Sequence, residues 1–324
     1  MRRDLDSLLV EYYNKFNEDK RLKSRHGQVE FNTTMHFIKE AVESIKKEET
    51  TGTIENAGIT ENVGTTVKPT ADGETAKILE IADIGAGTGG YTIPLLMEGH
   101  NVTAVELVKY NLGILKKNAA KVLGQGLQKN TCANSAETDV AQVSAIQETQ
   151  YGTLTAYNGN ALKLKKLKDN SYDITLLLGP MYHLHSAEDK VKALKEAKRI
   201  TKPGGYIFVA YVMADYAVVK YGFVEKNIRT SIANGDLNED YSIKSNENEL
   251  YDYVRLSDID EYNKAADLER VKIVAPDGPA DYIRNVLNDM DEETFQLFLD
   301  YQIKNAERAD LLGASSHTLD VLKK

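Results

Sequence analysis

The chain has 324 residues, of which 42% are hydrophobic and 27% are charged. That length and composition suffice for the core of one large domain or two small ones. The 40 lysines and arginines are outnumbered by 49 aspartates and glutamates, which leaves a formal net charge of −9. Proteins that bind the nucleic-acid backbone neutralise its phosphates with basic residues, so we do not expect nucleic acid as a partner.

The sequence also argues against a membrane or secreted protein. It contains no run of about 18 apolar residues, the length that a membrane-spanning helix needs. Acidic residues interrupt the N-terminal segment MRRDLDSLLVEYY, where a signal peptide would be apolar. The single cysteine, Cys132, cannot form an intramolecular disulfide. We therefore expect a soluble, cytoplasmic protein, and the sequence leaves its oligomeric state open.

The first part of the chain predicts two helices. Apolar residues recur every three or four positions over 5–16 and again over 29–45, with the polar turn RLKSRHGQ between them. We interpret residues 1–46 as an N-terminal helical cap. Residues 47–76 are rich in Thr, Gly, Asn and Glu, a composition that cannot bury much apolar surface, and we predict a flexible insertion there.

The central part alternates short apolar runs with helical patterns. The runs cover 78–84, 101–107, 153–159, 172–178 and 206–212, and Ser186 with Asp189 resembles a capping box at the start of one of the intervening helices. Alternation of this kind predicts a parallel sheet with helices on both faces. A polar stretch at about 124–150 is expected to be a second insertion.

The last third of the chain predicts helices and two further strands. Helical patterns cover about 214–265 and 280–308, where we expect a lid, and strand patterns cover 268–276 and 317–324. Residues 77–324 would then form one α/β domain. We predict a doubly wound, mostly parallel, seven-stranded sheet with the N-terminal cap and helical insertions.

The informative motif is a glycine-rich turn at residues 83–90, between the first core strand and a helix. Glycines let the backbone turn sharply and let a ligand approach the main chain. Gly85-x-Gly87-x-x-Gly90 satisfies the dinucleotide fingerprint, and Asp83-x-Gly85-x-Gly87-x-Gly89 satisfies the pattern of methyltransferases that use S-adenosylmethionine. The turn alone does not distinguish the two.

Two carboxylates near the turn add context. Asp83 would repel a pyrophosphate but can accept hydrogen bonds from an ammonium group. Glu106, at the end of the second core strand, can accept from both ribose hydroxyls, which either ligand carries. The downstream order, with Asn160, then YDITLLLGPMYHL and then KPGG before a strand, resembles the class I S-adenosylmethionine-dependent methyltransferase domain over about 77–212.

The resemblance implies the seven-stranded fold, S-adenosylmethionine as cofactor and a set of contacts to it. Gly85, Ala86 and Gly87 would contact the cofactor through their backbone. Asp83 would hold its amino-acid end, directly or through water, and Glu106 its ribose.

The resemblance also assigns the adenine end of the cofactor. Asn160 stands where many members of the family have Asp and would accept from the adenine amino group, with the Ala161 N–H toward a ring nitrogen. Leu178, at the end of the fourth strand, would offer its carbonyl to the ammonium group. The segments SRHGQVEF, LLLGPMYHL and SSHTLDVL are similar to a bacterial subgroup that methylates small molecules, but this similarity names no substrate.

Three residues are candidates for the acceptor side. His183 can serve as a general base, since an imidazole titrates near neutral pH, and Tyr182 beside it can pack on a substrate ring. His26 is a second possible base if the N-terminal helices fold over the cofactor, and Arg25 and Glu30 would then line the same pocket. For both histidines the alternative is a packing or surface role. His183 and His185 have no third ligand at a suitable spacing, so we expect no metal.

These observations predict an enzyme that transfers a methyl group from S-adenosylmethionine to a nucleophilic O, N or S atom of a small molecule. The alternatives are a methyltransferase acting on RNA or protein, a nicotinamide-dependent oxidoreductase, and a non-catalytic regulator that binds S-adenosylmethionine. Gly179 lacks the acceptor side chain that enzymes methylating nucleobase amines carry after this strand, which argues against a nucleobase substrate.

Overall fold

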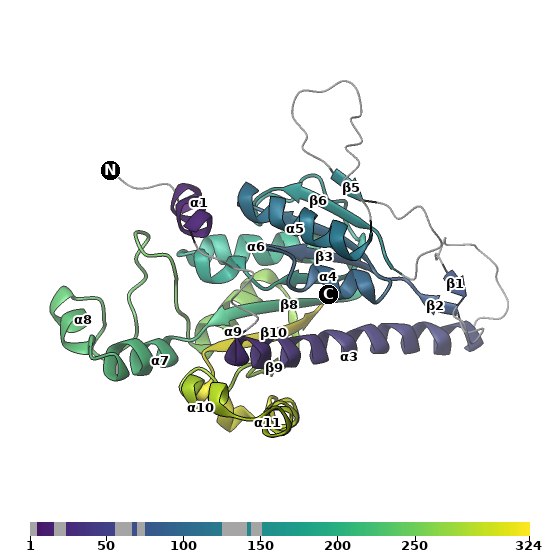
Figure 1. Cartoon of the computed structure of the whole chain (residues 1–324). Coiled ribbons are helices and arrows are strands. Elements are labelled where there is room, and N and C mark those ends of the chain that lie inside the picture. Colours follow the sequence, from purple (N-terminus) through teal and green to yellow (C-terminus); the bar gives the residue numbers. More distant parts are fainter. Residues whose placement is uncertain (1–4, 16–23, 56–66, 70–74, 125–140, 144–150) are drawn as a thin grey trace.

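The computed structural model describes residues 5–15, 24–55, 67–69, 75–124, 141–143 and 151–324 (Figure 1). Its centre is a sheet in the order β5-β6-β4-β3-β7-β8-β10-β9. The strands are β3 (Glu80–Ile84), β4 (Asn101–Glu106), β5 (Ala141–Val143), β6 (Leu154–Asn158), β7 (Tyr172–Leu177), β8 (Thr201–Val212), β9 (Glu269–Val274) and β10 (His317–Lys323).

The sheet confirms the predicted fold class. β6, β4, β3, β7 and β8 are mutually parallel, and β10 is antiparallel to both β8 and β9. The seven predicted strands are all present. The short β5 adds an eighth, antiparallel to β6 at the edge, inside the segment expected to be the second insertion. The neighbouring residues 125–140 and 144–150 lie outside the described residues.

Helices cover both faces of the sheet. They are α1 (Leu5–Lys15), α3 (Arg25–Glu55), α4 (Thr92–Met97), α5 (Lys109–Val122), α6 (Ala187–Ile200), α7 (Ala214–Ala217), α8 (Ile228–Asn234), α9 (Leu256–Ala266), α10 (Arg284–Asp289) and α11 (Glu292–Asn305). Alternate strand residues point to opposite faces. Ile81 packs into one apolar cluster with α3, α4 and α5, whereas its neighbour Ala82 packs into a second with α6 and α9. Each face is therefore sealed from water, as expected for strands with little polar alternation.

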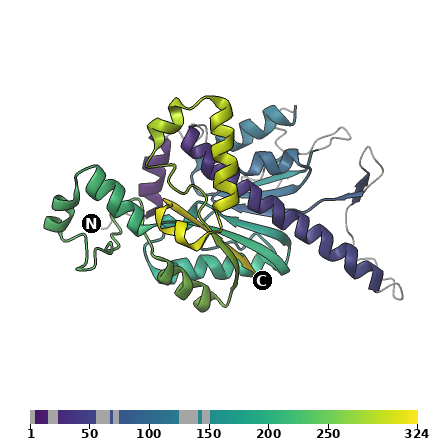
Figure 2. The ribbon, with the colours of Figure 1, turned by 90° about the horizontal axis from the view of Figure 1, so that it is seen from below.

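Helix α3 is longer than the sequence pattern predicted. It begins at Arg25 and continues to Glu55, past the expected boundary at residue 46. Its apolar residues as far as Ile45 pack on the sheet, and Figure 2 shows its far end extending beyond the sheet. Lys and Glu are good helix formers, so a polar segment after Ile45 can continue the helix without apolar periodicity.

The remainder of the predicted first insertion is only partly described. A separate antiparallel pair joins β1 (Val67–Pro69) and β2 (Thr75–Lys77). Residues 56–66 and 70–74 lie outside the described residues, so the flexible insertion stays a prediction.

Residues 214–255 form an arm that leaves β8 and returns to it. α7, a π-helical turn (Val218–Val224) and α8 carry the chain outward, away from the sheet (Figure 1). The return is fixed where Met213 and Val254 form a parallel bridge. It is further held by a buried ion pair of 2.6 Å between Lys190 Nζ of α6 and Asp252 Oδ2. The two ends of the arm therefore lie side by side at the sheet.

The helices after the arm have two different positions. α9, which falls within the predicted lid region, packs against α6 on one face of the sheet. α10 and α11 instead contact α3, through a small apolar cluster that contains Val29, Leu287 and Phe295. Among the helices of the described residues, none has the length and apolar composition that crossing a bilayer requires.

Candidate functional site

Two cavities lie side by side at the carboxyl edge of the parallel strands, where doubly wound sheets bind ligands. The first has a volume of 280 Å³ and is lined by the glycine turn and the ends of β4 and β6. The second has a volume of 620 Å³ and is lined by α1, α3, the arm and the loops around β9 and β10. Tyr13 and Tyr182 line both cavities.

The structure brings most of the predicted cofactor residues to the first cavity. The predicted site residues that line it are Gly85, Gly87, Glu106, Asn160, Ala161, Tyr182 and His183. Asp83, Ala86 and Leu178 are described but do not line it. His26 lines the second cavity.

The glycine turn needs glycine at its first position. Gly85 has a φ of 78°, and a Cβ there would lie 2.7 Å from Cδ of the Pro180 ring. Its N–H donates to the carbonyl of Val105 in β4 (2.7 Å), and the Ala86 N–H donates to the same oxygen (3.2 Å). The turn is therefore bound to β4 on one side and pressed against Pro180 on the other.

Glu106 joins the turn to the start of α5. Its Oε2 accepts a hydrogen bond from Gly87 N (2.8 Å) and its Oε1 accepts one from Val108 N (2.7 Å). The side chain is 6% exposed, at the wall of the first cavity. Each carboxylate oxygen has lone pairs for more than one hydrogen bond, so this geometry fits a group that binds two neighbouring hydroxyls.

Asp83 lies behind the turn. It is buried, and its Oδ2 accepts a hydrogen bond from the Thr92 hydroxyl (2.6 Å) at the start of α4. Burial raises the pKa of Asp83 from 3.8 to about 6, against the effect of the Thr92 hydrogen bonds. Any contact from Asp83 to a ligand in the first cavity would need a bridging group such as water.

The raised pKa of Asp83 makes stability depend on pH. The folded protein holds this proton more tightly than the unfolded chain, so the contribution favours folding at low pH and is lost as pH rises from about 4 to about 6. Over that window the free energy of unfolding of wild type should fall by about 3 kcal/mol relative to that of Asp83→Asn, since each pKa unit is worth about 1.4 kcal/mol. Urea unfolding of both proteins at pH 4.5 and pH 7.5 should show about 2 kcal/mol of this loss, since part of it has already occurred at pH 4.5. Identical pH dependence in the two proteins would contradict it.

The connection after β6 forms the floor of the first cavity. Asn160 Oδ1 accepts from Leu162 N (2.9 Å), which shapes a tight turn around Ala161. Leu178, at the end of β7, is partly buried, and its carbonyl accepts from the Tyr182 hydroxyl (3.3 Å).

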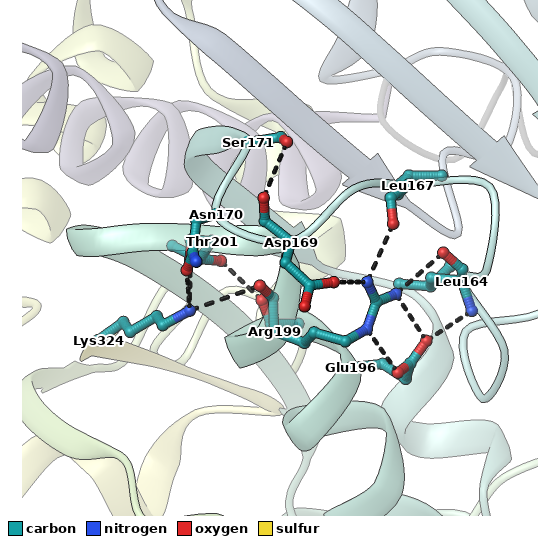
Figure 3. A network of polar contacts seen from close by, with 10 residues as sticks. Leu164, Leu167, Asp169, Asn170, Ser171, Glu196, Arg199, Thr201 and Lys324 are labelled. Atoms are coloured by element: carbon teal, nitrogen blue, oxygen red, sulfur yellow. Dashed lines mark hydrogen bonds and ion pairs between the residues drawn. The ribbon is translucent and has the colours of Figure 1, made fainter.

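A guanidinium holds this connection in place. Arg199 of α6 donates to the carbonyls of Leu164 and Leu167 (both 3.0 Å) and to Glu196 Oε1 (2.9 Å), and Glu196 Oε2 accepts from Leu164 N (2.7 Å) (Figure 3). The hydrogen bond to Glu196 raises the pKa of Arg199. These bonds fix the loop that follows Asn160, which lines the first cavity.

Tyrosine rings and charged groups line the second cavity. The tyrosines are Tyr12, Tyr13, Tyr182, Tyr216, Tyr221, Tyr251 and Tyr253, and the charged or titratable groups besides them are His26, Glu30, Asp277, Asp281, Arg284 and His317. A tyrosine offers an apolar ring and a hydrogen-bonding hydroxyl. The cavity therefore suits a small molecule with both apolar and polar parts.

His183 lines the first cavity, beside the shared residues Tyr13 and Tyr182, and is held at both ring nitrogens. Nδ1 lies 2.9 Å from the carbonyl oxygen of Leu250, and Nε2 lies 2.9 Å from the Tyr13 hydroxyl. The ring stacks on Tyr251, with 5.3 Å between centroids. Burial lowers the pKa of His183 to about 4. Near neutral pH this imidazole is uncharged, and it bonds α1 to the returning end of the arm.

Two of the three residues of α3 that were expected to line the acceptor pocket do line the second cavity. His26 and Glu30 line the second cavity. Burial, followed by the Arg284 guanidinium, lowers the pKa of His26. Arg25 does not line the cavity: its guanidinium stacks on the Phe295 ring (4.4 Å) and pairs with Glu292 (3.3 Å), which fastens α3 to α11. The expectation that Arg25 would line the pocket is therefore wrong.

Sequence reasoning missed an aspartate–histidine pair in the second cavity. Asp277 Oδ2 lies 2.7 Å from the ring nitrogen Nδ1 of His317. The backbone N–H of His317 donates to Asp277 Oδ1 (3.1 Å). The hydroxyls of Ser315 and Ser316 also donate to this carboxylate. Burial opposes the charged form of Asp277, but His317 and the serine hydrogen bonds outweigh it, and its pKa is lowered overall.

Comparison with known proteins agrees with this geometry. Residues 82–209 match the model of a family described as a methyltransferase domain. No curated protein matches the chain significantly. The matched residues include the glycine turn, Glu106, Asn160 and His183, so they cover most of the first cavity.

Several solved structures are similar to this chain at low sequence identity. Magnesium protoporphyrin IX methyltransferase from Synechocystis, with bound S-adenosylhomocysteine, is 10% identical, covers 99% of this chain and 100% of its own, and has a TM-score of 0.51. A methyltransferase from Methanosarcina mazei is 12% identical over 76% of this chain and 92% of its own (TM-score 0.46). One from Leishmania major is 13% identical over 98% and 83% (TM-score 0.48).

Proposed function

Because the chain carries a class I S-adenosylmethionine-dependent methyltransferase domain, we propose that it methylates a small molecule bound in the second cavity. The observation that supports this acceptor class is the arrangement of the two cavities. They share Tyr13 and Tyr182, and the second is bounded by α1, α3 and the arm. An acceptor in the second cavity would lie next to a methyl donor in the first.

We propose that the residues of the first cavity hold the cofactor, which supplies an electrophilic methyl group when bound. The backbone of Gly85, Ala86 and Gly87 would contact it, and Glu106, bonded to Gly87 N and Val108 N, would accept from the ribose hydroxyls. The close packing of Gly85 on Pro180 supports this fit, because the turn has no room for a side chain.

The remaining cofactor residues would act at its two ends. Asn160 Oδ1 would be shared between Leu162 N and the adenine amino group, with Ala161 N–H beside it. At the other end the Leu178 carbonyl would accept from the ammonium group. Asp83 does not line the cavity, so we propose that it reaches that group through water.

The protein's contribution to the reaction is alignment and exclusion of water. Tyr182 lines both cavities, and His183 beside it lines the first. With a pKa of about 4 and Nε2 bonded to Tyr13, His183 is a poor proton acceptor near neutral pH, and we propose that it orients Tyr13.

The test is transfer of a labelled methyl group from S-adenosylmethionine to a panel of phenols, alcohols, amines, thiols and carboxylates, each separately. We expect label in a low-molecular-weight product. A Glu106→Ala variant should give none, and Glu293→Ala, exposed on α11, should behave as wild type. Label recovered only in added RNA or protein would contradict the proposal.

A further inference from the structure

We propose that His317, positioned by Asp277, accepts the proton that the acceptor loses as it is methylated. This inference rests on the proposed function and names the chemical class of the acceptor. A group that must lose a proton to become a nucleophile is a hydroxyl or an ammonium group, whereas a carboxylate is already ionised at neutral pH.

The geometry of the pair fixes which ring nitrogen carries hydrogen. A carboxylate can only accept hydrogen bonds, so Nδ1 of His317, 2.7 Å from Asp277 Oδ2, carries the hydrogen. Nε2, on the opposite side of the ring, is then the nitrogen that can take a proton. Asp277 is 4% exposed and accepts from Ser315, Ser316 and the His317 backbone as well, which holds it in one orientation.

The fold places this imidazole in the wall of the second cavity, near a residue that both cavities share. His317 is the first residue of β10 and pairs with Val212, the last residue of β8. Both residues line the second cavity, and the His317 ring lies 6.5 Å from the ring of Tyr182, which lines both cavities. An acceptor in the second cavity that contacts both His317 and Tyr182 would have its nucleophilic atom near the first cavity, because Tyr182 lines both.

The other histidines that line these cavities are less suited to the role. The carboxylate next to His317 stabilises its protonated form. His183 has a pKa lowered to about 4 by burial and is bonded to Tyr13. The pKa of His26 is lowered by burial and by Arg284. Among the described residues that line the cavities, His317 is the histidine with a carboxylate on its ring nitrogen.

The proposed step balances as follows. The acceptor gives its proton to Nε2 of His317, and the lone pair on the acceptor atom forms the new bond to the methyl carbon. The electron pair of the broken carbon–sulfur bond stays on sulfur, which becomes a neutral thioether. His317 then releases the proton to solvent.

Several groups near His317 could also influence its titration. In the described residues of the cavity these are Tyr182 after β7, Asp277 and Asp281 after β9, Arg284 of α10, and His26 and Glu30 of α3. Of these charged or titratable groups, Asp277 is hydrogen-bonded to the imidazole, so its removal should have the largest effect on the pKa of His317.

The experiment uses the full chain and the acceptor from the panel that gives the highest turnover. His317→Asn should lower kcat about 100-fold, within the range for loss of a general base, with KM and S-adenosylhomocysteine affinity within threefold of wild type. Asp277→Asn should lower kcat about 10-fold or more and move the acidic limb of the kcat–pH profile to lower pH, because the carboxylate no longer stabilises the imidazolium. His36→Asn, on the exposed part of α3, should match wild type.

A second variant tests whether the loss of turnover comes from the missing base or from a change in structure. His317→Gly leaves space beside a 620 Å³ cavity, and added imidazole should restore at least 10-fold of the lost turnover. Three results would each overturn the proposal: kcat of His317→Asn within threefold of wild type, an unmoved pH limb in Asp277→Asn, or a carboxylate as the best acceptor of the panel. Label found only in macromolecules would instead count against the proposed function. If Asp277→Asn does not bind S-adenosylhomocysteine, His317→Asn and the imidazole rescue decide.

Discussion

Replacing Gly85 with alanine is expected to destabilise the protein by about 2–5 kcal/mol and to abolish cofactor binding. Two costs add together. A non-glycine residue at a φ of 78° is disfavoured by about 1–2 kcal/mol. A Cβ 2.7 Å from the rigid Pro180 ring forces a backbone shift that costs about 1–3 kcal/mol more. Urea unfolding and calorimetric titration with S-adenosylhomocysteine measure the two effects.

Two other glycines separate these costs. Gly204 has the same φ of 78°, but no atom of the described residues lies within 4 Å of the place a Cβ would take, so Gly204→Ala should cost about 1–2 kcal/mol. Gly113 lies inside α5 with open space around it, and Gly113→Ala should be stabilising by about 0.5–1 kcal/mol. Neither should change S-adenosylhomocysteine affinity. Equal losses at Gly85 and Gly204 would show that contact with Pro180 is unimportant.

Replacing Glu106 with alanine is expected to weaken S-adenosylhomocysteine binding by about 3 kcal/mol, or roughly 100-fold. Hydrogen bonds to a charged group contribute about 1.5–3 kcal/mol each, and a ribose would offer two. The variant also leaves the N–H groups of Gly87 and Val108 without their carboxylate partner, which loosens the turn. Glu106→Gln, which keeps one acceptor oxygen, should lose about half as much binding energy.

A glutamate at the opposite edge of the sheet is the matched control. Glu80 begins β3 and accepts from the Asn101 side chain (2.6 Å). Glu80→Ala should affect stability but leave S-adenosylhomocysteine affinity within threefold of wild type. If Glu106→Ala also binds within threefold, Glu106 does not hold the ribose.

The fold was predictable where burial dictated the pattern. β3, β4, β7 and β8 are mostly buried on both faces. The N-cap of α6 at Ser186, whose hydroxyl accepts from Asp189 N (3.1 Å), was visible as a capping signal. The end of α3 was not predictable in the same way. Among the side chains that the structure describes, Ile45 is the last apolar residue of α3 in the core cluster, and apolar periodicity reports only packing.

The part of the site that a local sequence motif contains was predictable. The part that the order of the strands brings together was not. Glu106 and Asn160 line the first cavity as expected. The Asp277–His317 pair was missed because the two residues lie 40 positions apart, and the segment SSHTLDVL indicated only a resemblance to a subgroup. An antiparallel last strand brings its first residue to the edge where the parallel strands end. Ser315, Ser316 and His317 at the start of that strand, together with Asp277 just after β9, were the available signal.

The arm of residues 214–255 has a consequence for how such a protein can diversify. Its two ends meet at Met213 and Val254, and the Lys190–Asp252 pair anchors the second of them. A change in the length or sequence of the arm between these two ends should leave the strands of the sheet in place. Tyr216, Tyr221, Tyr251 and Tyr253 of the arm nevertheless form part of the second cavity. A transplanted arm could therefore exchange one substrate preference for another on an unaltered catalytic scaffold.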